Sequence, residues 1–181
     1  MRWVIATLVF AASAFGAHYF TIRAVPGFIM NKVQSTFQAQ GLPLNHFVAS
    51  PRQTPETQRV VRPSPDLSYA VCRFDVSDGP VVISAPAWDG YGSLSIFDGQ
   101  TNNVFVASLD GQDASVILHK QGDAPEVGGR GSVGYVSEGH ATLQISGAGI
   151  ALIRRLAPTD ERHELSTARV ADAICEKINW R

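Results

Sequence analysis

Four Asp-Gly dipeptides divide the middle of the chain into short segments of nearly equal length. They begin at Asp78, Asp89, Asp98 and Asp110, so successive dipeptides are 11, 9 and 12 residues apart. Asp-Gly favours a tight turn because glycine readily adopts the positive φ that hairpin turns need. Turns at this spacing are typical of short antiparallel strands. The pattern therefore predicts a β-rich domain whose consecutive strands are joined by turns.

The segments between and beyond these turns have the patterns expected of strands. Residues 67–75 alternate between two faces of a strand. One face carries Ser68, Ala70, Cys72 and Phe74, and the other carries Leu67, Tyr69, Val71, Arg73 and Asp75. Further strands are expected at residues 81–85, 93–97, 104–107, 115–119, 132–136, 141–145 and 150–155, with a glycine-rich loop at 121–131.

The end of the chain is expected to be helical. From about Thr159 the sequence becomes polar, and apolar residues then recur along one helical face. These residues are Val170, Ala171, Ile174, Cys175 and Ile178. The expected fold is therefore mainly β, an antiparallel β-sandwich or open barrel with a C-terminal helix packed against it.

The first 25 residues differ sharply from this body. Residues 3–22 are almost all apolar or small, and residues 1–30 carry only Arg2 and Arg23 as charged side chains. Twenty helical residues span about 30 Å, the thickness of the hydrocarbon core of a bilayer. We interpret residues 1–25 as an uncleaved transmembrane helix. A cleavable signal peptide, with a site at residues 12–14, is the alternative.

Arg2 and the amino terminus favour an N-inside orientation, although Arg23 and Lys32 lie on the other flank. The expectation is a single-pass protein of the inner (cytoplasmic) membrane that contacts the lipid through residues 3–22. Its C-terminal domain would lie on the periplasmic side.

Residues 26–62 are expected to form a short helix and a Pro-rich linker, followed by the β-rich domain at 63–181. Pro26 should break or kink the first helix. Beyond it, Ile29, Met30, Val33 and Phe37 recur at helical spacing. We expect this helix to pack on the body. The alternative is that it lies on the membrane surface.

Composition excludes several classes of function. Residues 31–181 carry 13 basic and 16 acidic side chains, and a nucleic-acid binder needs a basic face instead. The five histidines show no paired metal spacing, and no C-x-x-C or G-x-S-x-G motif occurs. Residues 129–134 fit G-x-G-x-x-G, but a strand-like segment follows where a nucleotide site needs a helix. We therefore predict no catalytic residue, metal or cofactor, and no nucleic-acid partner.

Two sets of side chains are candidates for a more specific role. Asp66, Tyr69 and Arg73 lie on or beside the first long strand, and Arg73 could bind a carboxylate ligand in a bidentate manner. A solvated polar edge is the alternative. Cys72 and Cys175 each lie on an apolar face, and outside the membrane they could form a disulfide. Two buried, reduced thiols are the alternative.

Several short motifs resemble the family called domain of unknown function 1254. They are residues 65–69 (PDLSY), the hairpin at 74–83 (FDVSDGPVVI), residues 89–91 (DGY), Asp98 and residues 101–103 (TNN). The match is good over about residues 63–105. The Arg of the family's Gly-Arg-Tyr turn is missing, because Gly90 directly precedes Tyr91.

The resemblance implies a jelly-roll-like β domain in a short, membrane-anchored bacterial form. It also implies a separately encoded partner resembling the domain of unknown function 1214 family, which longer members carry in the same chain. It carries over no activity. We expect a non-catalytic binding or accessory subunit of the envelope, with Asp66, Tyr69, Arg73, Asp98 and Asn102 as candidate ligand-binding residues. An envelope hydrolase using Asp66, Tyr69, Arg73 and Asp98, or a purely structural element, is the alternative.

Overall fold

The fold was analysed in a computed structural model, which describes residues 2–54, 63–120, 122 and 141–178. Three features expected from the sequence fall outside these residues. They are the strand at 132–136, the G-x-G-x-x-G segment at 129–134 and, except for residue 122, the glycine-rich loop at 121–131.

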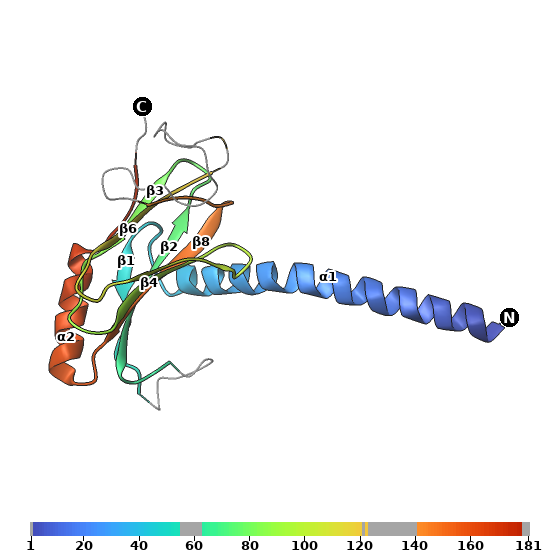
Figure 1. Cartoon of the computed structure of the whole chain (residues 1–181), viewed down its shortest axis with the longest axis horizontal. Coiled ribbons are helices and arrows are strands. Elements are labelled where there is room, and N and C mark those ends of the chain that lie inside the picture. The colour runs from blue at the N-terminus through green and yellow to red at the C-terminus, as the bar shows by residue number, and fades with distance from the viewer. Residues whose placement is uncertain (1, 55–62, 121, 123–140, 179–181) are drawn as a thin grey trace.

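Two β-sheets pack face to face (Figure 1). Sheet A has the order β1-β2-β8-β4-β5, with bounds Phe47–Ala49, Leu67–Asp75, Ala148–Leu156, Gly92–Phe97 and Asn103–Ser108. Sheet B has the order β7-β6-β3-β9, with bounds Ala141–Gln144, Ala114–His119, Val81–Ala85 and Ile174–Lys177. Neighbouring strands are antiparallel, apart from the parallel pair β6 and β7. The predicted mainly β fold is confirmed, and of its two forms the structure has the sandwich.

A single hydrophobic core fills the space between the sheets. Phe74 and Ile153 from sheet A meet Ile83 and Leu118 from sheet B, and all four are at most 1% exposed. The alternation expected for residues 67–75 is confirmed, because Ser68, Ala70, Cys72 and Phe74 are all buried. We call the core side of sheet A its inner face and the opposite side its outer face.

The Asp-Gly turns join consecutive strands, as expected, but only the turn at Asp98 joins a hydrogen-bonded pair, β4 and β5. The other three connect strands of different sheets, so the hairpin expected at residues 74–83 is wrong.

The turns also differ in backbone conformation. Gly79, Gly90 and Gly111 have positive φ angles of 136°, 92° and 68°. In the fourth turn Gly99 does not, and Thr101 takes a φ of 65° instead. The side chain of Asp98 holds this last turn by accepting hydrogen bonds from the backbone of the two residues on either side of Thr101. Local hydrogen bonds thus fix a conformation that a β-branched residue would not choose alone.

The C-terminal helix is present but ends earlier than expected. Helix α2 (Asp160–Ala168) begins after Thr159, whose Oγ1 accepts the backbone N–H of Arg162. A 3-10 turn, η1 (Arg169–Asp172), and strand β9 follow it. The expectation of a helical stripe through residue 178 is therefore wrong for its second half. Strand β9 pairs with β3, and the hydrogen bonds of that open sheet edge outweigh the local helical pattern.

Helix α1 (Arg2–Ala39) runs through Pro26 without ending, so the expected break is not found. Proline removes one backbone hydrogen bond, and the well-formed turns on both sides maintain the helix. The helix projects away from the sandwich at its N-terminal end and meets sheet A at its C-terminal end (Figure 1). The segment expected to be a linker contains strand β1, which extends sheet A.

Candidate functional site

A network of hydrogen bonds joins α1 to the outer face of sheet A. Residues 2–25 of α1 are exposed on all sides. From Pro26 onward one face is covered, and it includes Met30, Val33, Gln34 and Phe37. Of the four positions expected from the sequence, Met30, Val33 and Phe37 lie on this face, whereas Ile29 is exposed. The interpretation that this segment packs on the body is confirmed.

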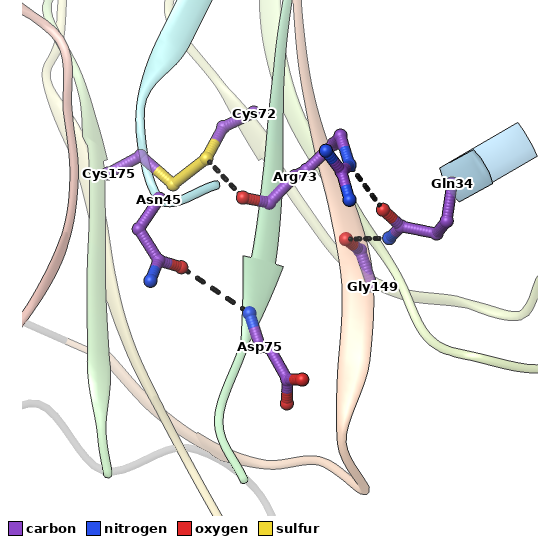
Figure 2. The surroundings of a disulfide bond; sticks show 7 residues. All are labelled: Gln34, Asn45, Cys72, Arg73, Asp75, Gly149 and Cys175. Carbon is purple, nitrogen blue, oxygen red and sulfur yellow. Dashed lines mark hydrogen bonds between the residues drawn. A yellow bond between two sulfur atoms is a disulfide. The ribbon is translucent and has the colours of Figure 1, made fainter. Parts of the chain in front are cut away.

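Arg73 lies at the centre of this contact (Figure 2). It stands on the outer face of β2 and is only 9% exposed. Its Nε donates to Gln34 Oε1 at 2.8 Å and one terminal nitrogen donates to the Leu42 carbonyl at 2.9 Å. The other terminal nitrogen lies 3.4 Å from Gln38 Oε1. The guanidinium thus binds α1 and the residues after it, not a free carboxylate.

The amide of Gln34 completes the connection. Its oxygen accepts from Arg73, while its Nε2 donates to the carbonyl of Gly149 on β8 at 2.7 Å. Asn45 joins from the other side of the strand, since its N–H donates to the Arg73 carbonyl at 2.6 Å. Helix α1 is therefore hydrogen-bonded to two neighbouring strands of sheet A, which gives it a defined angle to the sandwich.

The β4–β5 hairpin approaches α1 closer to the apolar segment. A Cβ placed on Gly27 would lie 2.8 Å from Nε2 of Gln100, the end of a flexible side chain, so the tip of the hairpin lies beside the helix at this position. Gly27 is five residues, or about 7.5 Å of helix, beyond Ile22. The body therefore begins almost immediately after the apolar segment ends.

The five residues expected to bind a ligand do not form one site. The carboxylate of Asp98 accepts the backbone N–H groups of Gln100 and Asn102 and the side-chain amide of Asn102, each at 2.8 Å. Tyr69 accepts the N–H of Ser64 through its hydroxyl at 2.9 Å. Asp66 is exposed. Asp98, Asn102, Tyr69 and Arg73 therefore have partners within the chain, whereas Asp66 is exposed. Of the five, the described hydrogen bonds bring together only Asp98 and Asn102.

Cys72 and Cys175 are brought to disulfide-bonding distance, with their sulfurs 1.97 Å apart (Figure 2). Cys72 is on β2 of sheet A and Cys175 on β9 of sheet B, so the bond would connect the two layers of the sandwich. Cys175 was expected on a helix and lies on a strand instead. Both residues are nearly fully buried, which agrees with the apolar faces assigned to them.

Comparison with known proteins identifies the family. Residues 44–169, more than half of the chain, match the family described as "Protein of unknown function (DUF1254)". The chain is a member of the DUF1254 family. The match contains strands β1 to β8 and α2, whereas α1 and β9 with Cys175 lie outside it.

Two solved structures resemble this DUF1254 protein. The VPA0106 protein of Vibrio parahaemolyticus superposes with a TM-score of 0.60 at 15% identity, and the match covers 90% of the present chain and 37% of that protein. An uncharacterized protein of Burkholderia cenocepacia gives a TM-score of 0.41 at 12% identity, covering 80% and 38% of the two chains. No curated protein is similar in sequence. The present chain thus spans just over a third of the Vibrio protein, whose likeness shows the fold alone.

The DUF1254 domain also contains a buried arginine that no sequence pattern singled out. Arg155 lies on the inner face of β8 and is 0% exposed. Its two terminal nitrogens donate to the carbonyls of Ser166 and Pro86 at 3.3 and 3.2 Å, and its guanidinium lies 5.6 Å from the Trp88 ring. Burial and, to a smaller extent, the positive charge of Arg169 lower the pKa of Arg155 to about 10, although the negative charge of Asp172 partly opposes them.

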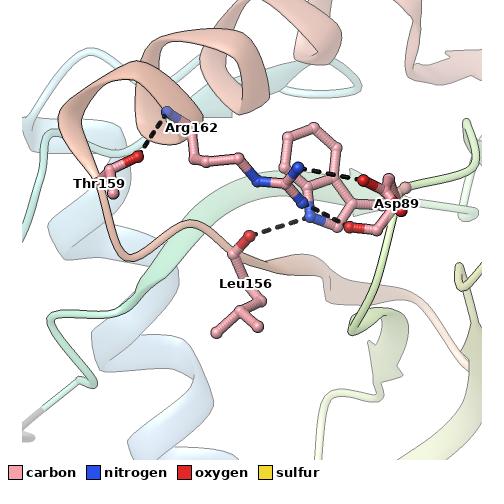
Figure 3. A network of polar contacts seen from close by, with 5 residues as sticks. Asp89, Leu156, Thr159 and Arg162 are labelled. Carbon is pink, nitrogen blue, oxygen red and sulfur yellow. Dashed lines mark hydrogen bonds and ion pairs between the residues drawn. The ribbon is translucent and has the colours of Figure 1, made fainter.

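A second arginine, Arg162, lies at the same end of the DUF1254 domain (Figure 3). Arg162 on α2 packs on the Trp88 ring at 4.8 Å and pairs with the carboxylate of Asp89 at 3.2 Å. The indole N–H of Trp88 donates to the carbonyl of Leu156 at 3.0 Å. The tryptophan thus contacts two guanidinium groups, and the cluster fixes α2 against the end of the sandwich. Its components come from three separate segments, so no local pattern could have revealed it.

Proposed function

We propose that this protein is an envelope accessory subunit that holds a DUF1254 domain close to the outer surface of the inner membrane. Helix α1 would cross the membrane once, and the sandwich would lie on the periplasmic side. The observation that carries the proposal is the continuity of α1. One helix is exposed and apolar at residues 3–22 and is then hydrogen-bonded to sheet A through Gln34.

The structure of α1 favours an anchor over a cleaved signal. The helix is long and apolar enough to cross a membrane, a test that a signal sequence would also pass. Cleavage after Ala14 would leave a helix that begins with Phe15 and exposes Tyr19 and Phe20. Such an exposed aromatic surface is unfavourable in water but suits a bilayer and its interface. Keeping the helix whole places these side chains in lipid.

The close approach of the two cysteines supports the periplasmic side. Disulfides persist in oxidising compartments and are rare in the bacterial cytoplasm. Arg2, at the other end of the membrane segment, agrees with a cytoplasmic amino terminus. Both features support a single-pass protein with its C-terminal domain outside the cytoplasm.

The resemblance to longer members of the family supports a binding or accessory role. In those members a domain of the domain of unknown function 1214 family lies in the same chain. We propose that the present DUF1254 domain acts together with a separately encoded partner of that kind.

Membrane fractionation of the full-length protein tests the anchor. The chain should stay in the membrane after alkaline carbonate extraction, and alkaline phosphatase fused to its C-terminus should be active. Replacing Leu8 and Val9 with arginine should release the protein, because a charge inside the apolar segment is costly, with a maximum of about 2.5–3.5 kcal/mol at the helix centre. The control is Asn31→Arg, at an exposed position on the docked part of the helix. A soluble periplasmic product beginning near residue 15 would show a signal peptide instead.

The partner is tested separately by affinity purification from solubilised membranes. A tagged full-length chain should recover a protein of the domain of unknown function 1214 family in a fixed ratio. Recovery of the chain as a monomer, with the anchor intact, would reject the accessory role but not the membrane topology.

A further inference from the structure

A pocket of about 370 Å³ opens on the outer face of sheet A, separate from the contact with α1. It lies over β4, β5 and β8, and its lining includes Tyr91, Ser93, Val106, Ser108, Asp110 and Arg154. Ser93 and Arg154 are direct neighbours across the β4–β8 pair, and Ser93 is also opposite Ser108 on β5. A hydroxyl and a guanidinium therefore stand side by side on one patch of sheet.

Both groups have hydrogen-bonding capacity that the described chain does not use. Ser93 is only 6% exposed, and its Oγ is buried without a partner. Nε of Arg154 is also buried without a partner, and one terminal nitrogen makes a long bond of 3.3 Å to Ser95 Oγ. Buried polar groups are normally paired, because an unpaired one loses its bonds to water. Nε of Arg155 and Nε2 of His163 are also buried without a partner among the described residues, but of these four side chains Ser93 and Arg154 line one pocket together. This juxtaposition indicates that a ligand supplies their missing acceptor.

The charges around the pocket narrow the class of ligand. Among the described residues Arg154 forms no ion pair, in contrast to Arg52, Arg162 and Arg169. A guanidinium beside a hydroxyl donor matches the two oxygens of a carboxylate. The carboxylate of Asp110 in the same lining disfavours ligands with two negative charges, such as phosphate.

The apolar part of the pocket indicates the chemical character of the rest of the ligand. Val106 is 60% exposed and Tyr91 is 50% exposed, and both line the pocket beside the two polar groups. A short aliphatic chain could cover them while its carboxylate reached Arg154. The volume is in the range of small-molecule sites.

We infer that Arg154 and Ser93 form a binding site for the carboxylate of a small, singly charged ligand with a short aliphatic chain. This inference does not depend on the proposed membrane function or on the partner. The carboxylate can belong to a free organic acid or to the C-terminus of a peptide, and the experiment distinguishes these sources.

The test uses saturation-transfer difference NMR on the full-length chain in lipid nanodiscs, with empty nanodiscs as the blank. Isovalerate is the probe, and isovaleramide, its uncharged counterpart of the same shape, is the control. Isovalerate should give a saturable signal that the amide and inorganic phosphate at equal concentration do not displace. The tripeptide Gly-Gly-Val and its C-terminal amide form a second pair. Tighter binding of the tripeptide acid than of isovalerate assigns the site to a peptide terminus, and the reverse assigns it to a free acid.

Two variants connect the binding to these residues. Arg154→Gln should weaken isovalerate binding about tenfold or more, the usual effect of losing a charged hydrogen bond. Ser93→Ala should weaken it about threefold to tenfold without lowering the urea midpoint, because it removes only an unpaired hydroxyl. Arg169→Gln, an exposed arginine on η1, is the matched control and should bind normally.

Three results would overturn the inference. They are the absence of a saturable signal from either acid, equal displacement by phosphate, and unchanged binding in the Ser93→Ala variant. If Arg154→Gln does not fold, Ser93→Ala alone decides the question, since its fold is expected to be intact.

Discussion

The two faces of sheet A are built from the same strands but differ in almost every physical respect. The inner face is covered by sheet B and α2 and holds fully buried apolar side chains such as Phe74 and Ile153. The outer face carries polar side chains and is covered in part by the last third of α1. The inner face contributes most of the stability of the domain. The outer face carries the contact with α1 and the pocket at Arg154.

Two consecutive residues of β8 show the difference most clearly. Arg155 faces inward, where both terminal nitrogens have carbonyl partners and the guanidinium lies against Trp88. Arg154 faces outward, where its Nε has no partner among the described residues. The Nε of Arg155 also has no partner among the described residues, so the two arginines differ in their terminal nitrogens. Those of Arg155 are held by backbone carbonyls, whereas Arg154 lines a pocket and makes one long bond to Ser95.

Removal of the disulfide should cause the largest loss of stability, and it tests the role of the inner face. Replacing Cys72 and Cys175 together with alanine should lower the free energy of unfolding by about 4–5 kcal/mol, because the bond closes a loop with a sequence separation of 103 residues. Urea unfolding of the full-length protein, followed by tryptophan fluorescence, measures this. Wild-type protein under a strong reductant should match the variant. Two titratable thiols in unfolded protein prepared without reductant would contradict the bond.

Disruption of the contact between α1 and sheet A should cause the second-largest effect, and it tests the role of the outer face. Arg73→Met should favour the undocking of α1 by about 2–3 kcal/mol, since two strong bonds from a charged donor are lost. The urea midpoint of the sandwich should change little. Hydrogen exchange should therefore accelerate in residues 30–39 and stay slow in β8.

Gln38→Ala is the matched control for this prediction, because its bond to Arg73 is longer, at 3.4 Å, and its side chain is exposed. It should leave exchange in α1 nearly unchanged. If Arg73→Met instead destabilised the whole sandwich, the outer face would be as important for folding as the core, and the comparison between the faces would fail.

A pair of serines gives the smallest effect and the most direct comparison. Ser68, on the inner face, is hydrogen-bonded to the hydroxyl of Ser166, whereas Ser93, on the outer face, has no partner. Ser68→Ala should therefore lower the free energy of unfolding by about 1–2 kcal/mol. Ser93→Ala should leave it unchanged or raise it by up to about 1 kcal/mol. Urea midpoints measured side by side decide this. A similar loss of stability in both variants would mean that a buried hydroxyl contributes equally on the two faces.

The strands could be predicted because their signals are local. The alternation of residues 67–75 and the Asp-Gly turns depend on neighbours within a few positions, and strand β2 occupies the predicted range. The C-terminal segment could not be placed in the same way. Its apolar positions fit a helix, but the open edge of β3 is 90 residues away in sequence and made Ile174–Lys177 a strand.

The candidate site was harder to predict than the fold. Arg73 was predicted as a candidate for binding a carboxylate ligand, but its partners lie on α1 and the residues after it, more than 30 positions away. Arg154, Ser93 and Arg155 were not singled out, because a charged residue in a strand has no local feature that tells whether it is buried or paired.

By itself, the sequence determined the apolar N-terminal helix, the β character of the body and the inward side of Cys72, since hydrophobic period and turn chemistry are properties of short segments. Only the tertiary structure decided that Cys175 lies on a strand opposite Cys72 and that α1 continues through Pro26 onto Arg73. It also decided that Arg154 and Arg155 face opposite sides of the sheet with different partners. These outcomes depend on contacts between distant segments, and such contacts form only when the two layers and the helix pack together.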